Sequence, residues 1–266
     1  MKSFLAHLKR FDWVFIAPAI LLVAIGLASL YSSSLSRGDF FNFQKQVVFF
    51  IIGFILMIMT SFLDWRLLKN DSYLILALYF LCVLSLAGLL LFAPETRNIK
   101  GWYKLGPISI DPREFTKIVL LILLAKYFSL RHIEMYRIVH ILVSGIYVFL
   151  PAILAFLQPD LGSVLIFGFL WITILMMSGI KMRHFLILTL CGLAFFLFSW
   201  FFLLKDYQKS RVISFISPQL EPLGIGWSQN QSKIAIGSGG FFGQGIGRGS
   251  QTQNGCLQEP QTDFIL

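Results

Sequence analysis

The stretch WVFIAPAILLVAIGLASLYSSSL, residues 13–35, runs for 23 residues without a charged side chain. A helix needs about 20 mainly apolar residues to cross the hydrocarbon core of a bilayer, so this stretch predicts a transmembrane helix. Lys9 and Arg10 precede it, as basic residues precede the apolar core of a secretory signal peptide. More apolar stretches follow without a clear small-residue cleavage site, so we interpret residues 13–35 as a retained first transmembrane helix.

Six more apolar segments predict further spans. They are residues 47–63, 73–92, 115–130, 138–157, 161–179 and 185–204. The composition agrees, because 57% of the 266 residues are hydrophobic and 13% are charged, whereas a soluble domain has about 25% charged residues. Mean hydropathy is +0.77. These values exclude a soluble globule and an intrinsically disordered chain, and we predict an all-α polytopic membrane protein with about seven transmembrane helices within residues 1–204.

The distribution of Lys and Arg predicts the orientation of these helices. With the N-terminus inside, the short inside segments carry more Lys and Arg than the short outside segments, as the positive-inside rule requires. Seven spans then place residues 205–266 outside. The net charge of +9 reflects these loops, and we expect membrane lipids and no nucleic acid as partners, because no basic soluble module with interleaved aromatic residues is present. Cys82, Cys191 and Cys256 form neither a disulfide framework nor a metal site.

The segment 94–117 departs from this charge pattern. It is predicted to lie outside, yet it holds Arg97, Lys100, Lys104, Arg113 and Lys117. Proline and glycine residues punctuate it, so we expect a turn-rich loop rather than one helix. Trp102 and Tyr103 suit the membrane–water interface. Two interpretations stay open, a solvated charged loop and a site that presents cations to an anion at the outer membrane surface.

Acidic residues lie at two predicted span boundaries. Asp160, in the sequence QPDLG of residues 158–162, is either a functional carboxylate at the edge of the hydrocarbon or the cap of the helix that follows it. Glu114 and Lys117 are three residues apart at the start of the fourth span, so on a helix they share a face and can pair. A surface pair of this kind stabilises a helix only slightly, and its position at the mouth of a membrane helix favours a functional role.

The tail contains the glycine-rich sequence QSKIAIGSGGFFGQGIGRG, residues 231–249. Glycine lets the backbone approach a ligand closely and turn its N–H groups toward oxyanions. No nucleotide-binding glycine motif is present, and a flexible linker is the alternative, although the interleaved Ile, Phe and Arg argue for structure. The chain ends in QTDFIL, residues 261–266, where a polar loop meets a new apolar run, so we expect an eighth span cut short.

Several of these segments together resemble the SEDS family (shape, elongation, division, sporulation), whose members include RodA, FtsW and SpoVE. The matching pieces are Gly101-Trp102, Pro112–Ile118, Gln158–Gly162, Asp206-Tyr207-Gln208 with Arg211-Val212, Pro222–Trp227, Gln231–Gly240, Gln251-Thr252-Gln253 and Thr262-Asp263-Phe264. Their order and spacing cover the whole chain, and the RodA branch is the most similar. The resemblance implies a ten-helix fold, of which this chain holds about seven helices and a large extracytoplasmic loop, residues 205–266.

The resemblance also implies an activity and partners. It implies a peptidoglycan glycosyltransferase that polymerises lipid II, the undecaprenyl-diphosphate-linked disaccharide-pentapeptide, at the outer face of the bacterial cytoplasmic membrane during cell elongation or division. A class B penicillin-binding transpeptidase is the implied partner. A divalent cation, Mg²⁺ or Mn²⁺, is the implied cofactor, with no organic cofactor.

The resemblance assigns roles to particular residues. It implies that Asp263 is the catalytic carboxylate and that Trp102, Glu114 and Lys117 are needed for activity. Glycan polymerisation requires a base for the acceptor 4-hydroxyl and cations for the departing diphosphate, roles that Asp263 and Lys117, Lys100, Lys104 or a metal ion could fill. The remaining expectations are that Ser232 and Lys233 bind substrate and that Asp160, Gly239 and Gly240 support the site.

Two alternative functions stay open at this point. A flippase for lipid-linked precursors would bind the same lipid, but it should carry ionisable residues along a path through the spans, and few are present there. An inactive, truncated scaffold that binds a transpeptidase is the second alternative, since the expected truncation after Leu266 removes the helix that would anchor Asp263.

Overall fold

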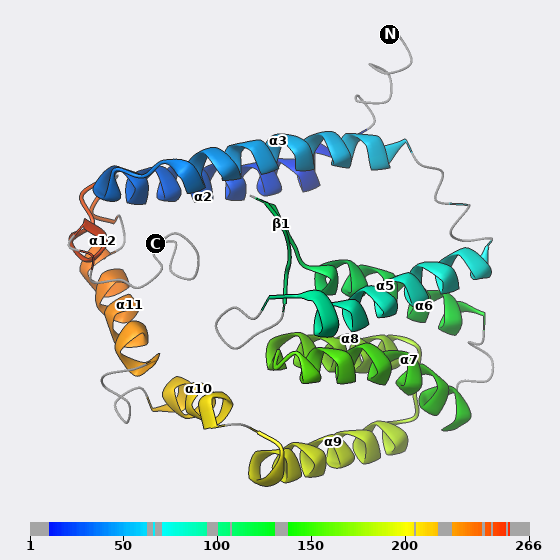
Figure 1. Ribbon diagram of the computed structural model, residues 1–266. Helices are drawn as coiled ribbons and strands as arrows, with labels where there is room; N and C mark the ends of the chain where they lie inside the picture. The colour runs from blue at the N-terminus through cyan, green and yellow to red at the C-terminus, as the bar shows by residue number, and fades with distance from the viewer. Residues whose placement is uncertain are drawn as a thin grey trace. The chain divides into compact units, whose positions relative to one another are not determined.

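The structure is a computed structural model that describes residues 11–62, 66, 71–94, 101–106, 108–130, 138–204, 206–217, 225–240, 243–245, 247–253 and 255. The elements in chain order are α2 (Trp13–Arg37), α3 (Phe41–Ser61), α5 (Ser72–Phe92), β1 (Tyr103–Leu105), β2 (Ile108–Ile110), α6 (Pro112–Ser129), α7 (Ile138–Leu157), α8 (Leu161–Met177), α9 (Met182–Phe202), α10 (Asp206–Ile216), α11 (Ile225–Gly239) and α12 (Ser250–Gln253). Helices α2, α3 and α5 to α9 lie on the seven apolar segments of the sequence (Figure 1).

Five of these helices are long and apolar enough to cross a membrane, namely α2, α3, α5, α7 and α9. Helix α8 is apolar but has only 17 residues, and α6 begins with charged residues, including Arg113 and Glu114. The structure therefore confirms an all-helical membrane protein with five candidate spans in its described part. The full number of about seven spans stays a prediction.

The chain divides into two compact units. Unit 1 comprises Met1–Leu63 and Lys205–Leu266, and unit 2 comprises Asp64–Leu204. Unit 1 thus joins the first two helices to the tail. The sequence-based division at residue 204 separates predicted membrane spans from the predicted extracytoplasmic loop, and it stays a prediction.

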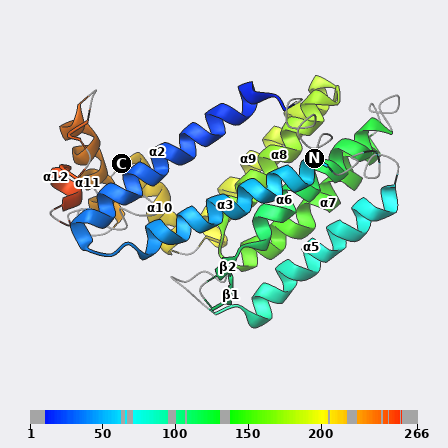
Figure 2. The ribbon, with the colours of Figure 1, turned by 90° about the horizontal axis from the view of Figure 1, so that it is seen from above.

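Unit 2 is built on the packing of α5, α6, α7 and α8, which lie side by side (Figures 1 and 2). Its core contains fully buried residues such as Tyr79, Leu120, Leu124 and Phe167. The Tyr79 hydroxyl donates to the Tyr147 carbonyl oxygen at 2.9 Å, which ties α5 to α7. Large apolar side chains also cover the outside of the bundle, as expected for helices whose surroundings are lipid rather than water.

A short hairpin interrupts the helical order. Strands β1 and β2 pair antiparallel, with Tyr103 opposite Ile110 and Lys104 opposite Ser109. The Tyr103 hydroxyl donates to the Ser85 carbonyl oxygen of α5 at 2.8 Å, so the hairpin is anchored on that helix (Figure 2). These two strands of three residues each are a local addition to a fold that is otherwise helical in its described part. The two strands of a hairpin satisfy each other's backbone N–H and C=O groups by cross-strand hydrogen bonds. A segment rich in turns can therefore form a hairpin without a larger sheet.

The predicted outer loop ends earlier than the sequence suggested. Helix α6 begins at Pro112, so residues 112–117 are helical and not part of a turn-rich loop. The carboxylate of Asp111 accepts from the backbone N–H of Arg113 at 3.0 Å and caps the helix. Proline fits the first helical position, where its missing N–H costs no hydrogen bond. These two residues set the start of α6 and place its charged first turn.

Unit 1 contains α2 and α3, which pack against each other, and the helices of the tail. The tail is not a continuous loop, because α11 takes in residues 231–239 of the glycine-rich sequence and α10 and α12 flank it. Glycines after α11 adopt left-handed backbone conformations, with φ of 57° at Gly240 and 74° at Gly243. The tail therefore contains helices α10, α11 and α12, and its position outside the membrane as an extracytoplasmic loop stays a prediction.

Candidate functional site

Arg113 is the centre of a buried polar cluster in unit 2. It lies in the first turn of α6 and is only 3% exposed. Its Nε and Nη2 atoms donate to the two carboxylate oxygens of Asp111 at 2.8 Å and 2.7 Å. Its Nη1 atom donates to the carboxylate of Asp160, and Nη2 also donates to the Gly101 carbonyl oxygen at 3.2 Å. The guanidinium is thus held by two carboxylates and by the backbone of the preceding loop.

Asp160 both caps a helix and pairs with a charge. It is the N-cap of α8, where its carboxylate accepts from the Ser163 backbone N–H at 3.3 Å and from the Ser163 hydroxyl at 2.6 Å. The same carboxylate accepts from Arg113. The structure therefore confirms the capping interpretation. The ion pair gives Asp160 a second contact, so it links the beginnings of α6 and α8.

The loop before the hairpin folds tightly onto Arg113. The Arg113 guanidinium carbon lies 5.7 Å from the centre of the Trp102 ring, a distance at which a cation and an aromatic face attract each other. Gly101 is buried beside it, and a Cβ atom at this position would overlap the guanidinium. Glycine is required at position 101 because the guanidinium fills the space of a side chain.

Glu114 and Lys117 follow in the same helical turns. The Lys117 Nζ lies 2.6 Å from the Glu114 Oε1, so the pairing predicted from their spacing is present. The side chain of Glu114 is 66% exposed and that of Lys117 is 19% exposed. The α6 start therefore combines a fully neutralised buried cation, Arg113, with a second cation whose partner is accessible. Helix N-termini add a partial positive charge that favours anions.

The structure brings together four of the predicted site residues, and they all lie in unit 2. Arg113 contacts Trp102 and Asp160, and it is followed on α6 by Glu114 and Lys117. Their roles toward a substrate stay predictions.

The other predicted site residues lie elsewhere. Ser232 and Lys233 are on α11 of unit 1, where Lys233 is exposed, and Gly239 and Gly240 mark the end of that helix. Lys100 and Asp263 lie outside the described residues. Within the described part of the chain, no group of three or more His, Cys, Asp or Glu residues could hold a metal ion. Asp111 and Asp160 are instead paired with Arg113, so the divalent cation stays a prediction.

Sequence reasoning missed the centre of this cluster. In the sequence, Arg113 is one of five basic residues of the outer segment 94–117, and the pattern assigns neither Arg113 nor Asp111 to the site. A signal was present, because Asp111 and Arg113 bracket a proline at the start of an apolar segment, and buried charges need partners. The partner Asp160 is 47 residues away in sequence, so only the packing of α6 and α8 identifies the pair.

Known proteins are similar to this chain in sequence. The chain is 30% identical over 258 residues to the peptidoglycan glycosyltransferase MrdB of Escherichia coli K12, with 96% of this chain and 69% of the relative covered. It is 33% identical over 265 residues to the stage V sporulation protein E of Bacillus subtilis, covering 96% and 70%.

Solved structures are also similar. A chain from a peptidoglycan synthase complex, described as coordinating polymerization and crosslinking, superposes with a TM-score of 0.71 at 32% identity, covering 88% of this chain and 68% of the other. The rod shape determining protein RodA of Thermus thermophilus gives 0.60 at 29% identity, covering 70% and 60%. The family model described as cell cycle protein, which unites FtsW, RodA and SpoVE, matches residues 12–266. The chain therefore belongs to the FtsW/RodA/SpoVE (SEDS) family of membrane proteins.

Proposed function

We propose that this protein is a peptidoglycan glycosyltransferase that polymerises lipid II into glycan strands at the outer face of a bacterial cytoplasmic membrane, in cell elongation or division. The names of the similar MrdB and FtsW proteins support this activity. The observation that carries it in this chain is the cluster at the start of α6, where Arg113 fixes Trp102 and the helix that presents Glu114 and Lys117.

Lys117 is the cation that we assign to the diphosphate of the lipid. Arg113 is already neutralised by Asp111 and Asp160, so it positions the site and does not serve as the free cation. Lys117 forms an ion pair with Glu114, and no second carboxylate pairs with it within the part of the chain that the structure describes; the Glu114 carboxylate is exposed and can turn away. A preorganised cation beside a helix N-terminus stabilises the negative charge that develops on a departing diphosphate.

The bond-forming step follows the chemistry of an inverting transfer. Asp263 acts as general base and takes the proton of the acceptor 4-hydroxyl while that oxygen attacks the anomeric carbon of the donor. The bond from that carbon to the diphosphate oxygen breaks, and the undecaprenyl diphosphate leaves with the electron pair. An α-linked donor then gives a β-linked polymer. Ser232 and Lys233 contact the substrate in this proposal, and a divalent cation, Mg²⁺ or Mn²⁺, supplies further charge neutralisation when bound.

The proposed setting is a bacterial cytoplasmic membrane with the N-terminus inside. Seven spans of a ten-helix fold place the start of α6 and the tail on the outer side, where lipid II is presented. A class B penicillin-binding transpeptidase is the proposed partner, and the support for it is the similarity to a chain from a peptidoglycan synthase complex. Such a partner would cross-link the strands that this protein makes.

The test is polymerisation of purified lipid II by the purified protein in liposomes, with wild-type and Asp263→Asn compared. We expect glycan strands from the wild-type protein and a loss of about 10²–10⁴-fold in rate for the variant, which is the usual effect of removing a general base. Normal polymerisation by Asp263→Asn would show that the base is wrongly assigned. Transport of lipid II across the bilayer without any polymer would favour the flippase alternative.

A further inference from the structure

The oxygen atoms around the Arg113 guanidinium form a donor set of the kind that binds a hard metal ion. The carboxylates of Asp111 and Asp160 and the carbonyl oxygen of Gly101 converge on it. Carboxylate and carbonyl oxygens are the protein ligands that Mg²⁺, Mn²⁺ and Ca²⁺ prefer. A side chain of the protein therefore fills the position in this cluster that a metal ion would take.

A divalent cation would find no open ligand between the two carboxylates. The Asp111 Oδ1 accepts from the Arg113 backbone N–H at 3.0 Å and from its Nε at 2.8 Å, and Oδ2 accepts from Nη2 at 2.7 Å. The Asp160 Oδ1 accepts from the Ser163 N–H at 3.3 Å, and Oδ2 accepts from the Ser163 hydroxyl at 2.6 Å and from Arg113. Each of the four carboxylate oxygens thus has a donor that a metal ion would have to displace.

The guanidinium also opposes a metal ion by its charge and its place. It is planar and presents its N–H groups in a fixed fork, so it reaches both carboxylates and the carbonyl oxygen at once. A second cation between the same oxygens would lie against it, and like charges repel strongly where water is excluded. The side chains of Asp111 and Asp160 are 22% and 21% exposed, against 4% for Arg113. Ions in solution could therefore reach both carboxylates once the guanidinium is gone.

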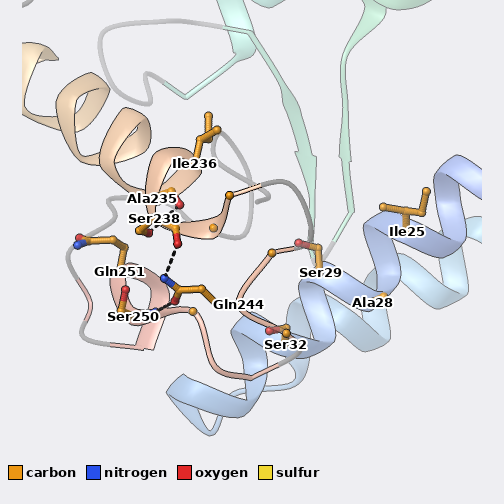
Figure 3. Close-up of a pocket in the computed structure, with 15 residues that line it drawn as sticks. Ile25, Ala28, Ser29, Ser32, Ala235, Ile236, Ser238, Gln244, Ser250 and Gln251 are labelled. Carbon is orange, nitrogen blue, oxygen red and sulfur yellow. Dashed lines mark hydrogen bonds between the residues drawn. The ribbon is translucent and has the colours of Figure 1, made fainter.

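A pocket at the end of α11 in unit 1 offers a divalent cation no such donor set. Serines and glutamines are among its polar residues, and no carboxylate lines it (Figure 3). The amide of Gln244 is already used, because its Nε2 donates to the Ser238 carbonyl oxygen at 3.0 Å and its Oε1 accepts from the Ser250 N–H at 2.8 Å (Figure 3). Affinity for such ions rises with the number of charged ligands, so the pair Asp111 and Asp160 is the better candidate.

We propose that Arg113 is the resident cation of this cluster, in the place of a divalent metal ion, and that removing the guanidinium turns the cluster into a divalent-cation site. The family resemblance implies a divalent cation, and in the wild-type protein these two carboxylates do not hold it. The segment that carries Trp102 and the first turn of α6 is then held together without a metal ion.

The test is a titration of the detergent-solubilised protein with Mn²⁺, in which electron paramagnetic resonance measures the free ion. Arg113→Ala removes the guanidinium and leaves both carboxylates in place. We expect this variant to bind one Mn²⁺ ion more than the wild-type protein, and Mn²⁺ should raise its Tm. The Tm of the wild-type protein should be the same in EDTA and in Mg²⁺.

Three further variants separate the site from a general effect of charge. Lys117→Ala removes one positive charge from the same helix but frees only the exposed Glu114, so it should gain no Mn²⁺ site. Arg113→Lys keeps a cation in the cluster and should gain none either. Arg113→Ala combined with Asp160→Asn should lose the new site, because loss of a group that merely orients a ligand already lowers metal affinity about 10–100-fold.

Arg113→Gln is a second variant for the case that Arg113→Ala does not fold in the absence of metal, since its amide can still donate to one carboxylate. Folding of either variant only when Mn²⁺ is present would support the proposal. Failure of both to gain an Mn²⁺ site, or to fold with Mn²⁺, would overturn it. Binding of Mn²⁺ by the wild-type protein that Asp160→Asn abolishes would overturn it as well.

These readouts are metal binding and thermal stability, so they can be separated from the outcome of the polymerisation assay. A new Mn²⁺ site in Arg113→Ala, together with no polymer from the wild-type protein, would support the resident cation and refute the polymerase. Polymer from the wild-type protein, together with no new site in either Arg113 variant, would do the reverse.

Discussion

Arg113 and Asp160, 47 residues apart in sequence, form an ion pair where α6 and α8 begin. Each residue also serves its own helix end, because Asp160 caps α8 and Arg113 binds the cap of α6, Asp111. The pair therefore fixes two helix starts to each other. The loop that carries Trp102 is fixed by the same guanidinium.

Removal of the Arg113 charge should destabilise the protein strongly. Arg113→Met leaves the carboxylates of Asp111 and Asp160 without their cation, and breaking a buried pair in this way costs about 3–5 kcal/mol. A thermal melt of the detergent-solubilised protein should show a clearly lower Tm. Lys117→Met is the matched control on the same helix, because its partner Glu114 is exposed, and such a pair contributes about 1 kcal/mol or less. Equal Tm values for the two variants would contradict the structural role of Arg113.

Asp160→Asn tests the carboxylate side of the same pair. An asparagine can still cap α8 but cannot neutralise Arg113. We expect the folded yield to fall at least as much as the specific activity of the protein that does fold. The measurement is the monodisperse fraction in size-exclusion chromatography together with polymerisation per folded molecule. A variant that folds in full yield but is inactive would instead assign Asp160 a direct catalytic role.

Gly101→Ala should displace the guanidinium, since the new methyl group would occupy its position. We expect a lower Tm and reduced polymerisation together, because the loop with Trp102 moves with Arg113. Gly168→Ala is the control in the same unit, since nothing lies within 4 Å of a Cβ there, and alanine suits a helix better than glycine. A Tm for Gly101→Ala as high as that of the control would show that the loop adjusts without disturbing Arg113.

Lys117→Ala should abolish most polymerisation while the protein still inserts normally into the membrane. The reason is the loss of the cation that we assign to the departing diphosphate. The measurement is polymer yield from lipid II at matched membrane levels, and Lys181→Ala, at the start of α9 on the predicted inner side, is the control. An unchanged polymer yield would show that the outer segment is a solvated charged loop and does not bind the diphosphate.

Cysteine labelling checks the proposed orientation. In a background without the natural cysteines, a membrane-impermeant maleimide added outside should modify a cysteine at position 250 in Ser250→Cys but not one at position 70 in Asn70→Cys. The expected result follows from the excess of basic residues in the predicted inside loops. The reverse labelling pattern would require the opposite topology.

Tyr103→Phe should loosen the hairpin from α5, because it removes the hydrogen bond to the Ser85 carbonyl oxygen, worth about 1 kcal/mol. Burial raises the pKa of the Tyr103 hydroxyl, so the folded state favours the protonated donor. Its contribution is fully present below the ordinary tyrosine pKa of about 10 and is lost as the pH rises through the raised value. The amides of β1 and β2 should therefore be less protected against hydrogen exchange at alkaline pH than at pH 7 in the wild-type protein, when protection is measured relative to the free-peptide rate at each pH. This loss of protection should be smaller in the variant.

The apolar segments could be predicted from sequence because the membrane is their solvent. Each helix in a bilayer satisfies its own backbone hydrogen bonds, so about 20 apolar residues suffice to identify a span without any knowledge of its neighbours. Five of the predicted spans correspond to helices that are long and apolar enough to cross a membrane. Glu114 and Lys117 were predictable for a related reason, since a helix brings residues three apart onto one face.

Other features depended on contacts that no local pattern contains. Strands β1 and β2 are anchored on α5 by the hydrogen bond from the Tyr103 hydroxyl to the Ser85 carbonyl oxygen. The glycine-rich sequence is helical as far as Gly239, the last residue of α11. Both segments are rich in glycine or proline, and such residues indicate a turn without indicating what the turn packs against.

Composition, local period and the order of the motifs are sufficient to predict that the protein lies in a membrane, where its apolar helices lie and to which family it belongs. Two contacts came to light in the folded chain alone: Arg113 lies between Asp111 and Asp160, and the Gly247 backbone N–H donates to the Ser32 hydroxyl. Such contacts join residues that are far apart in sequence and that meet only when the chain folds. The sequence shows that a buried charge needs a partner, but it does not show which residue is that partner.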